Sequence, residues 1–185
     1  MISILMRKER NWRIGGLLIW ATLSCGGSTS SDRDIKTLDF TYNDTFSTAF
    51  SLKLNDRSDT VYVKQDFTKG SGLPSGSYYA IVHDDVKRLL ISHAESVLLL
   101  HPDSLYDEGL QDDEDYKICI VGSEANGCVR LHTLNPPQNV KLLSRHLRDL
   151  KDRLTYHKLE REINFVSDDI LPEPIKWGSV KFLPP

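Results

Sequence analysis

Between residues 38 and 82, apolar and polar side chains alternate over short runs, a pattern typical of half-buried β-strands. A cluster of turn-forming residues at 55–59, NDRSD, separates two of these runs and predicts a hairpin. The expected strands lie at 38–42, at about 46–55 and 59–66, and at 78–82.

Two later stretches carry apolar residues at spacings of three and four, which predicts two amphipathic helices. The first opens at residues 83–85, HDD, where acidic side chains suit the start of a helix, and Pro102 bounds it. The second begins at residues 135–137, NPP, and runs from about 137 to 157. Leu147 lies at the centre of its apolar stripe, and the basic residues on its other faces are interpreted as a solvated surface.

A second hairpin is predicted around residues 122–127. A four-residue turn at 122–125 would place Cys119 directly opposite Cys128. The dipeptide Asn126-Gly127 is the stronger short-range hairpin signal, and a turn there would separate the two cysteines. The pattern alone leaves both registers open.

The elements follow in the order hairpin, strand, helix, hairpin, helix and tail. Because hairpins join most of the strands, we expect an α+β fold: an antiparallel sheet of about five to six strands with two helices packed on one face. The tail holds too many apolar residues to be free in solvent, so we expect it to pack back on the domain.

The start of the chain has the layout of a secretory signal. A basic segment at 7–13 precedes an apolar segment at 14–23, which ends on small residues and Cys25. Residues 22–27, TLSCGG, resemble the lipobox of bacterial lipoproteins, although that family favours leucine at the third position before the cysteine, where this chain has Thr22. The resemblance implies a diacylated Cys25, cleavage just before it and, usually, acylation of the new amino group. An ordinary signal peptide and a buried apolar helix are the alternatives.

This reading divides the chain into three parts: a signal peptide at 1–24, a flexible tether at 25–37 and a single α+β domain at 38–185. A signal peptide begins with its basic segment and has no use for the run MISIL that precedes it here. Met6 is therefore favoured over Met1 as the true start. The order of elements is also similar to that of small Gram-negative lipoproteins with a domain of unknown function, a resemblance that implies no activity. Both resemblances predict an envelope protein of a Gram-negative bacterium, anchored by lipid to the outer or inner membrane.

The net charge of the chain limits the classes of partner that it can bind. There are 23 basic and 26 acidic residues, a net charge of −3, and removal of the basic signal leaves a mature chain near −6. This balance argues against nucleic-acid binding, which normally uses a basic face. With Cys25 lipidated, Cys119 and Cys128 remain in an oxidising compartment and are a candidate disulfide.

Acidic residues are concentrated after the first helix, where they form a candidate docking patch for a basic partner. A solvated loop and a calcium site are the alternatives, but the spacing lacks the order of a calcium loop. The histidines are scattered without ligand spacing, so we expect no metal or cofactor, and no nucleophile motif identifies a catalytic residue. The candidate docking residues are Asp107, Glu108, Asp112, Asp113, Glu114 and Asp115.

Two functions from different classes fit these features. The first is a non-enzymatic, lipid-anchored module that acts through protein contacts, such as an inhibitor or an immunity-type protein that neutralises a basic toxin. The second is a small envelope enzyme or ligand carrier. A deep pocket with converging His, Asp or Glu side chains would favour the second, and a shallow charged or aromatic surface would favour the first.

Overall fold

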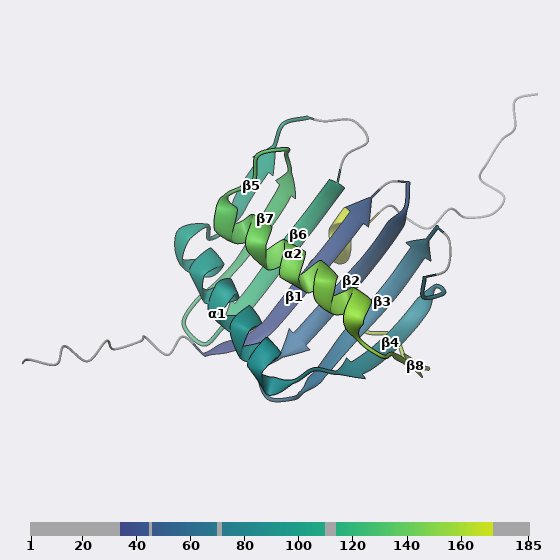
Figure 1. The fold of residues 1–185 in the computed structure, drawn as a ribbon. Coiled ribbons are helices and arrows are strands. Elements are labelled where there is room, and N and C mark those ends of the chain that lie inside the picture. Colours follow the sequence, from purple (N-terminus) through teal and green to yellow (C-terminus); the bar gives the residue numbers. More distant parts are fainter. Residues whose placement is uncertain (1–33, 45, 70–71, 110–113, 172–185) are drawn as a thin grey trace, which may run out of the picture. The chain divides into compact units, whose positions relative to one another are not determined.

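The structure, a computed structural model, describes residues 34–44, 46–69, 72–109 and 114–171. Within these ranges the strands and helices follow the chain as in Figure 1. They are β1 (Ile35–Asp44), β2 (Thr48–Asn55), β3 (Thr60–Thr68), β4 (Gly76–Ile81), α1 (Asp84–Leu100), β5 (Ser104–Asp107), β6 (Glu114–Gly122), β7 (Asn126–His132), α2 (Gln138–Arg153), β8 (His157–Leu159) and the 3₁₀-helix η1 (Asp168–Ile170).

The eight strands form one open, mixed sheet in the order β5-β7-β6-β1-β2-β3-β4-β8 (Figure 1). Neighbouring strands are antiparallel except β5 and β7, which are parallel. The α+β class is confirmed, but the expectation of five to six antiparallel strands is wrong. β5 lies in the stretch interpreted as an acidic loop, and β8 follows where the second helix was expected to end. At four and three residues, both are too short to show an alternation.

Both α-helices pack on the same face of the sheet (Figure 1). Leu38 and Phe40 of β1 and Leu143 and Leu147 of α2 have no exposed surface and belong to one apolar core between the layers. Successive side chains of a strand point to opposite faces, so the residues between these core positions lie on the far side of the sheet. The central strands therefore have one apolar and one polar face.

The helices begin close to their expected positions. α1 has Asp84 and Asp85 in its first turn, where they suit the positive end of the helix dipole. α2 ends at Arg153, earlier than expected, because Leu154 has extended backbone dihedrals of −86° and 150°. The chain then turns so that β8 pairs with β4.

The β6–β7 hairpin uses the four-residue turn at 122–125, since Val121 pairs with Asn126 and Cys119 with Cys128. Gly127, which the alternative register would put in the turn, lies in β7. A Cβ atom at Gly127 would come within 3.0 Å of Leu98 at the end of α1, so glycine permits this close approach.

The two ends of the described chain differ from the expected division into signal peptide, tether and domain. β1 begins at Ile35, which is buried, so residues 35–37 of the expected tether belong to the sheet. The rest of the tether up to residue 33 and the expected signal at 1–24 lie outside the described residues. Residues 164–170, named the strap below, lie across the polar face of the sheet through contacts with β1, β2, β3 and β6. No helix in the described part of the chain is both long and apolar enough to cross a membrane.

Candidate functional site

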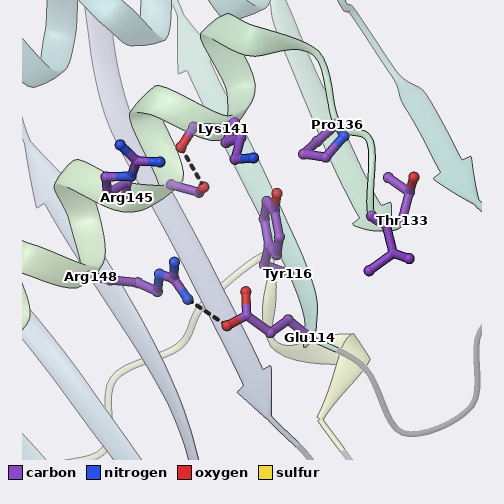
Figure 2. Close-up of a pocket in the computed structure, with 9 residues that line it drawn as sticks. Glu114, Tyr116, Thr133, Pro136, Lys141, Arg145 and Arg148 are labelled. Atoms are coloured by element: carbon purple, nitrogen blue, oxygen red, sulfur yellow. Dashed lines mark hydrogen bonds and ion pairs between the residues drawn. The ribbon is translucent and has the colours of Figure 1, made fainter.

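A groove lies where the first half of α2 passes over the start of β6 (Figure 2). Its volume is about 140 Å³. The loop between β7 and α2 forms its third wall. The lining residues are Glu114, Tyr116, Thr133, Leu134, Pro136, Lys141, Ser144, Arg145 and Arg148.

The helical repeat places three basic side chains on one side of α2. Lys141, Arg145 and Arg148 follow one another at spacings of four and three residues, which brings them to neighbouring positions on a helix surface. Burial of Leu143 and Leu147 in the core fixes the rotation of α2 about its axis. The basic residues therefore lie along the groove, beside Tyr116 and Glu114 on β6 (Figure 2).

Arg148 is the fixed member of this basic set. Its Nη1 atom lies 2.8 Å from Oε1 of Glu114 and donates to the Tyr42 hydroxyl at 3.2 Å. Its guanidinium carbon lies 5.0 Å from the centre of the Tyr42 ring, within the range of a cation–π contact. Burial acts to lower the pKa of Arg148, but the charge of Glu114 and the contact with Tyr42 together raise it above its ordinary value. Arg148 thus stays charged in the groove.

Tyr42 and Glu114 complete this small polar cluster. The Tyr42 hydroxyl donates to Oε1 of Glu114 at 2.7 Å. Burial, followed by the hydrogen bond and negative charge of Glu114, raises the pKa of Tyr42 well above its ordinary value of 10.0. Tyr42 therefore acts here as a neutral hydrogen-bond donor, and Tyr42 and Arg148 together hold the Glu114 carboxylate in place.

Lys141 and Arg145 differ from Arg148 because both are exposed and neither has an ion pair with another described residue. The first turn of α2 beside them has no side-chain cap, and unpaired amides at the start of a helix favour negative charge. Like charges at a spacing of four also repel each other, so an anion between them would relieve the repulsion. The groove can therefore bind a small anionic group.

The size of the groove limits what it holds. Its 140 Å³ is below the roughly 300–1,000 Å³ of most sites that enclose a whole small molecule. Ser144, which also lines it, donates its hydroxyl to the Lys141 carbonyl at 3.0 Å. The groove thus suits one carboxylate or phosphate group at the end of a larger partner.

The described acidic residues of the predicted docking patch each have a hydrogen-bond or ion-pair partner within the chain. Asp107 accepts from the amide of Gly109 at 2.8 Å and from His132, and Asp115 pairs with Arg130 at 2.7 Å. The hydrogen bond from Gly109, followed by that from His132, lowers the pKa of Asp107.

The remaining predicted acidic residues follow the same trend where they are described. Glu108 accepts from the amide of Leu134 at 3.1 Å, and Glu114 pairs with Arg148 as above. Asp112 and Asp113 lie outside the described residues. Each described member of the predicted patch is thus already engaged by a neighbour. The basic groove has no distinct signal in the sequence, because its basic residues resemble those of any solvated helix face.

The cysteines are the remaining predicted site residues, and the histidines were expected to hold no metal. Cys119 and Cys128 form a disulfide in the structure, with an S–S distance of 2.12 Å, while Cys25 lies outside the described residues. His93 on α1 is half-buried, and the centre of its ring lies 5.1 Å from that of His146 on α2. Within the described ranges, no group of three or more His, Cys, Asp or Glu side chains is placed to hold a metal ion.

The fold and the groove together define an α+β domain with a small basic groove on its helical side. In comparisons with known proteins, no family model matches the chain, and no curated protein matches it significantly.

Proposed function

We propose that the protein is a lipid-anchored, non-enzymatic binding module of the bacterial envelope. Its basic groove takes a carboxylate of a protein partner. The observation that carries this proposal is the pair of exposed cations, Lys141 and Arg145, beside the fixed cation Arg148. Arginine suits this task because its planar guanidinium matches a carboxylate with two parallel hydrogen bonds.

The anchoring part of the proposal rests on the lipobox-like residues before and at Cys25. One acyl chain gives only weak membrane binding, whereas the two or more chains of a bacterial lipoprotein hold stably. The disulfide between Cys119 and Cys128 fits the same compartment, because disulfides persist in the oxidising envelope and are rare in the cytosol.

The structure changes the kind of partner that we favour. The sequence suggested a basic partner for an acidic loop, but the described acidic residues of that loop are occupied by neighbours. The groove instead presents cations without described partners, which suits an acidic surface. An inhibitor or immunity-type role remains the concrete version of this hypothesis, now with an acidic segment of the target as the contact.

A ligand carrier is the second candidate, and one cavity favours it. A cavity of about 510 Å³ lies between β3, β4, β8 and the strap, and Lys64, Asp66 and Asp168 are among its lining residues. Its volume is in the range of small-molecule sites. However, charged and polar side chains dominate its walls, whereas such sites are usually lined by apolar ones. We therefore rank it below the binding module.

Charge reversal in the groove tests the proposal. Arg145→Glu should weaken binding of an acetylated hexaglutamate peptide about tenfold, equivalent to roughly 1.4 kcal/mol. Arg153→Glu is the matched control, because Arg153 is an exposed residue at the end of the same helix and does not line the groove. Isothermal titration at low salt measures both.

The same two variants extend the test to the natural partner. Wild type and variants are solubilised from membranes after cross-linking, and co-purifying proteins are quantified. A partner of the groove should be lost with Arg145→Glu and kept with Arg153→Glu. Equal recovery with both variants, or equal affinity for the peptide, would remove the groove as the binding site.

A further inference from the structure

The central strands carry polar and charged side chains on the face opposite the helices. Asp39, Thr41 and Ser51 are almost fully buried there, beneath the strap. An antiparallel sheet can leave one such face in water, so this face does not need an apolar cover. The side chains that form its centre are Asp39 and Thr41 of β1, Ser51 and Lys53 of β2, Lys64 of β3 and Lys117 of β6.

The strap places two carboxylates against lysines of this face. Asp168 lies 3.4 Å from the ammonium of Lys64. Asp169 accepts from Lys117 with both oxygens, at 2.9 and 2.8 Å. The two adjacent carboxylates thus reach lysines on two strands that are separated by β1 and β2.

Hydrogen bonds fix the middle of the strap to β1. The amide of Val166 donates to Oδ2 of Asp39 at 2.7 Å, and the hydroxyls of Ser167 and Thr41 lie 2.8 Å apart. The Lys53 ammonium donates to the carbonyl of Asn164. In each of these contacts the sheet supplies a side chain, whereas the strap supplies a backbone amide, a hydroxyl and a backbone carbonyl.

Two apolar side chains anchor the ends of the strap. Phe165 is 6% exposed, and the Lys53 ammonium lies 5.2 Å from the centre of its ring. Ile170 is 9% exposed, whereas Val166 between them points away and is 59% exposed. The bound pattern is therefore an aromatic residue, a hydroxyl, two carboxylates and an aliphatic residue.

The contacts that hold the strap on the sheet are of a kind that another segment could replace. No backbone–backbone hydrogen bond between described residues joins it to the sheet, so it is not a strand of the fold. The side chain of Asp169 is 65% exposed, and exposed ion pairs hold weakly and are screened by salt. Beneath the strap, the positive charges of Lys53, Lys64 and Lys117 outnumber the carboxylates Asp39 and Asp66 that face them.

We propose that this polar sheet face is a docking surface for an extended acidic segment of a protein partner, and that the strap occupies it as an internal competitor. The charge of the face selects adjacent carboxylates, and Phe165 marks where an aromatic side chain of the partner sits. A tethered competitor reduces the apparent affinity of any partner by the fraction of molecules in which the face is open. The proposal goes beyond the groove at α2 and does not depend on it.

The test uses the full chain and a labelled synthetic peptide with the sequence of residues 161–171, REINFVSDDIL. In the variant Asp168→Lys/Asp169→Lys, the strap should leave its lysines, and the peptide should bind at least about tenfold more tightly than it binds wild type. Asp149→Lys/Asp152→Lys makes the same charge change on exposed positions of α2 and should bind the peptide as wild type does. Fluorescence anisotropy measures all three.

A charge swap separates recognition from damage to the fold. Lys64→Glu/Lys117→Glu should lose the natural peptide but bind a peptide that carries Asp168→Lys and Asp169→Lys. The milder variant Asp168→Asn/Asp169→Asn should move peptide affinity in the same direction as the lysine variant, by a smaller factor. Equal affinity of the natural peptide for wild type and both strap variants, or no binding to any of them, would overturn the proposal. If wild type forms concentration-dependent dimers in light scattering, the proposal of a separate protein partner would be wrong. The surface would then bind the strap of a second copy of this chain.

Discussion

At the scale of single residues, the contact between His93 and His146 stands out, because it joins the two helices through a pair of titratable rings. The Nδ1 atom of His146 is buried and has no hydrogen-bond partner among the described residues. Burial, followed by the nearby charge of His146, lowers the pKa of His93 below its ordinary value of 6.5. The packing of α1 against α2 therefore favours a neutral His93.

This contact makes stability depend on pH. Below pH 6.5 the unfolded chain takes up a proton at His93 before the folded chain does, so the stability of the fold should decrease as the pH falls from about 7 to 5. His93→Gln should flatten this part of the profile, whereas His83→Gln at an exposed position should not. Urea midpoints at pH 7.5, 6.5 and 5.5 measure it. Parallel profiles for wild type and His93→Gln would contradict the assignment.

At the scale of elements, α2 connects the core with the basic groove. Its leucines face the sheet, and its basic residues flank the contact. Any loss of packing along the leucine stripe should therefore disturb the groove as well.

Leu147→Ala tests the placement of this stripe. Leu147 has no exposed surface, and truncation of a buried leucine costs about 2–5 kcal/mol through lost burial and the cavity left behind. Leu89→Ala is the control, because Leu89 is 49% exposed on α1 and should cost less than about 0.5 kcal/mol. Equilibrium unfolding in urea compares them. Similar losses for the two variants would mean that α2 buries another face.

The β6–β7 hairpin makes a separate prediction. Cys119 and Cys128 are paired in register, with their Cα atoms 4.1 Å apart. Protein purified and unfolded without reductant should therefore show no reactive thiol at these positions. Because the closed loop is short, removal of both with serine should cost only about 2–3 kcal/mol. Two free thiols per chain in the unreduced protein would exclude the bridge.

Several elements could be predicted from the chain because their signals are local. The alternation around Ile118 and Val129 and the leucines of α2 each report one buried face within a few residues. β5 could not be predicted in this way, because it is four residues long and its pairing partner in the sheet is β7, beyond β6 in the chain.

The strap and the groove escaped prediction for a different reason, which is distance along the chain. Asp168 meets Lys64 across 104 positions, and Arg148 meets Tyr42 across 106. The sequence around Asp168 and around Arg148 does not distinguish either residue from a charged side chain in solvent. Local patterns therefore identified the layers of the fold but not the polar contacts between distant segments.

At the scale of the whole molecule, the proposed anchor at Cys25 would connect the domain to a membrane. Wild type should sediment with membranes and incorporate a fatty-acid analogue, and Cys25→Ala should do neither, because the thiol that accepts the lipid is missing. Ser28→Ala is a matched control just beyond the lipobox. Metabolic labelling followed by membrane flotation measures both properties. Equal labelling of wild type and Cys25→Ala would contradict the proposal that Cys25 carries the lipid.

The order of the sheet has a consequence for contacts between copies of the domain. Its edge strands, β5 and β8, are four and three residues long, shorter than every strand described between them. A long edge offers a row of unpaired amides and carbonyls that templates growth into fibres, and short edges offer little to such a template. If the proposed anchor gathers many copies on one leaflet, at local concentrations far above those in free solution, the short edges should keep them from polymerising strand to strand.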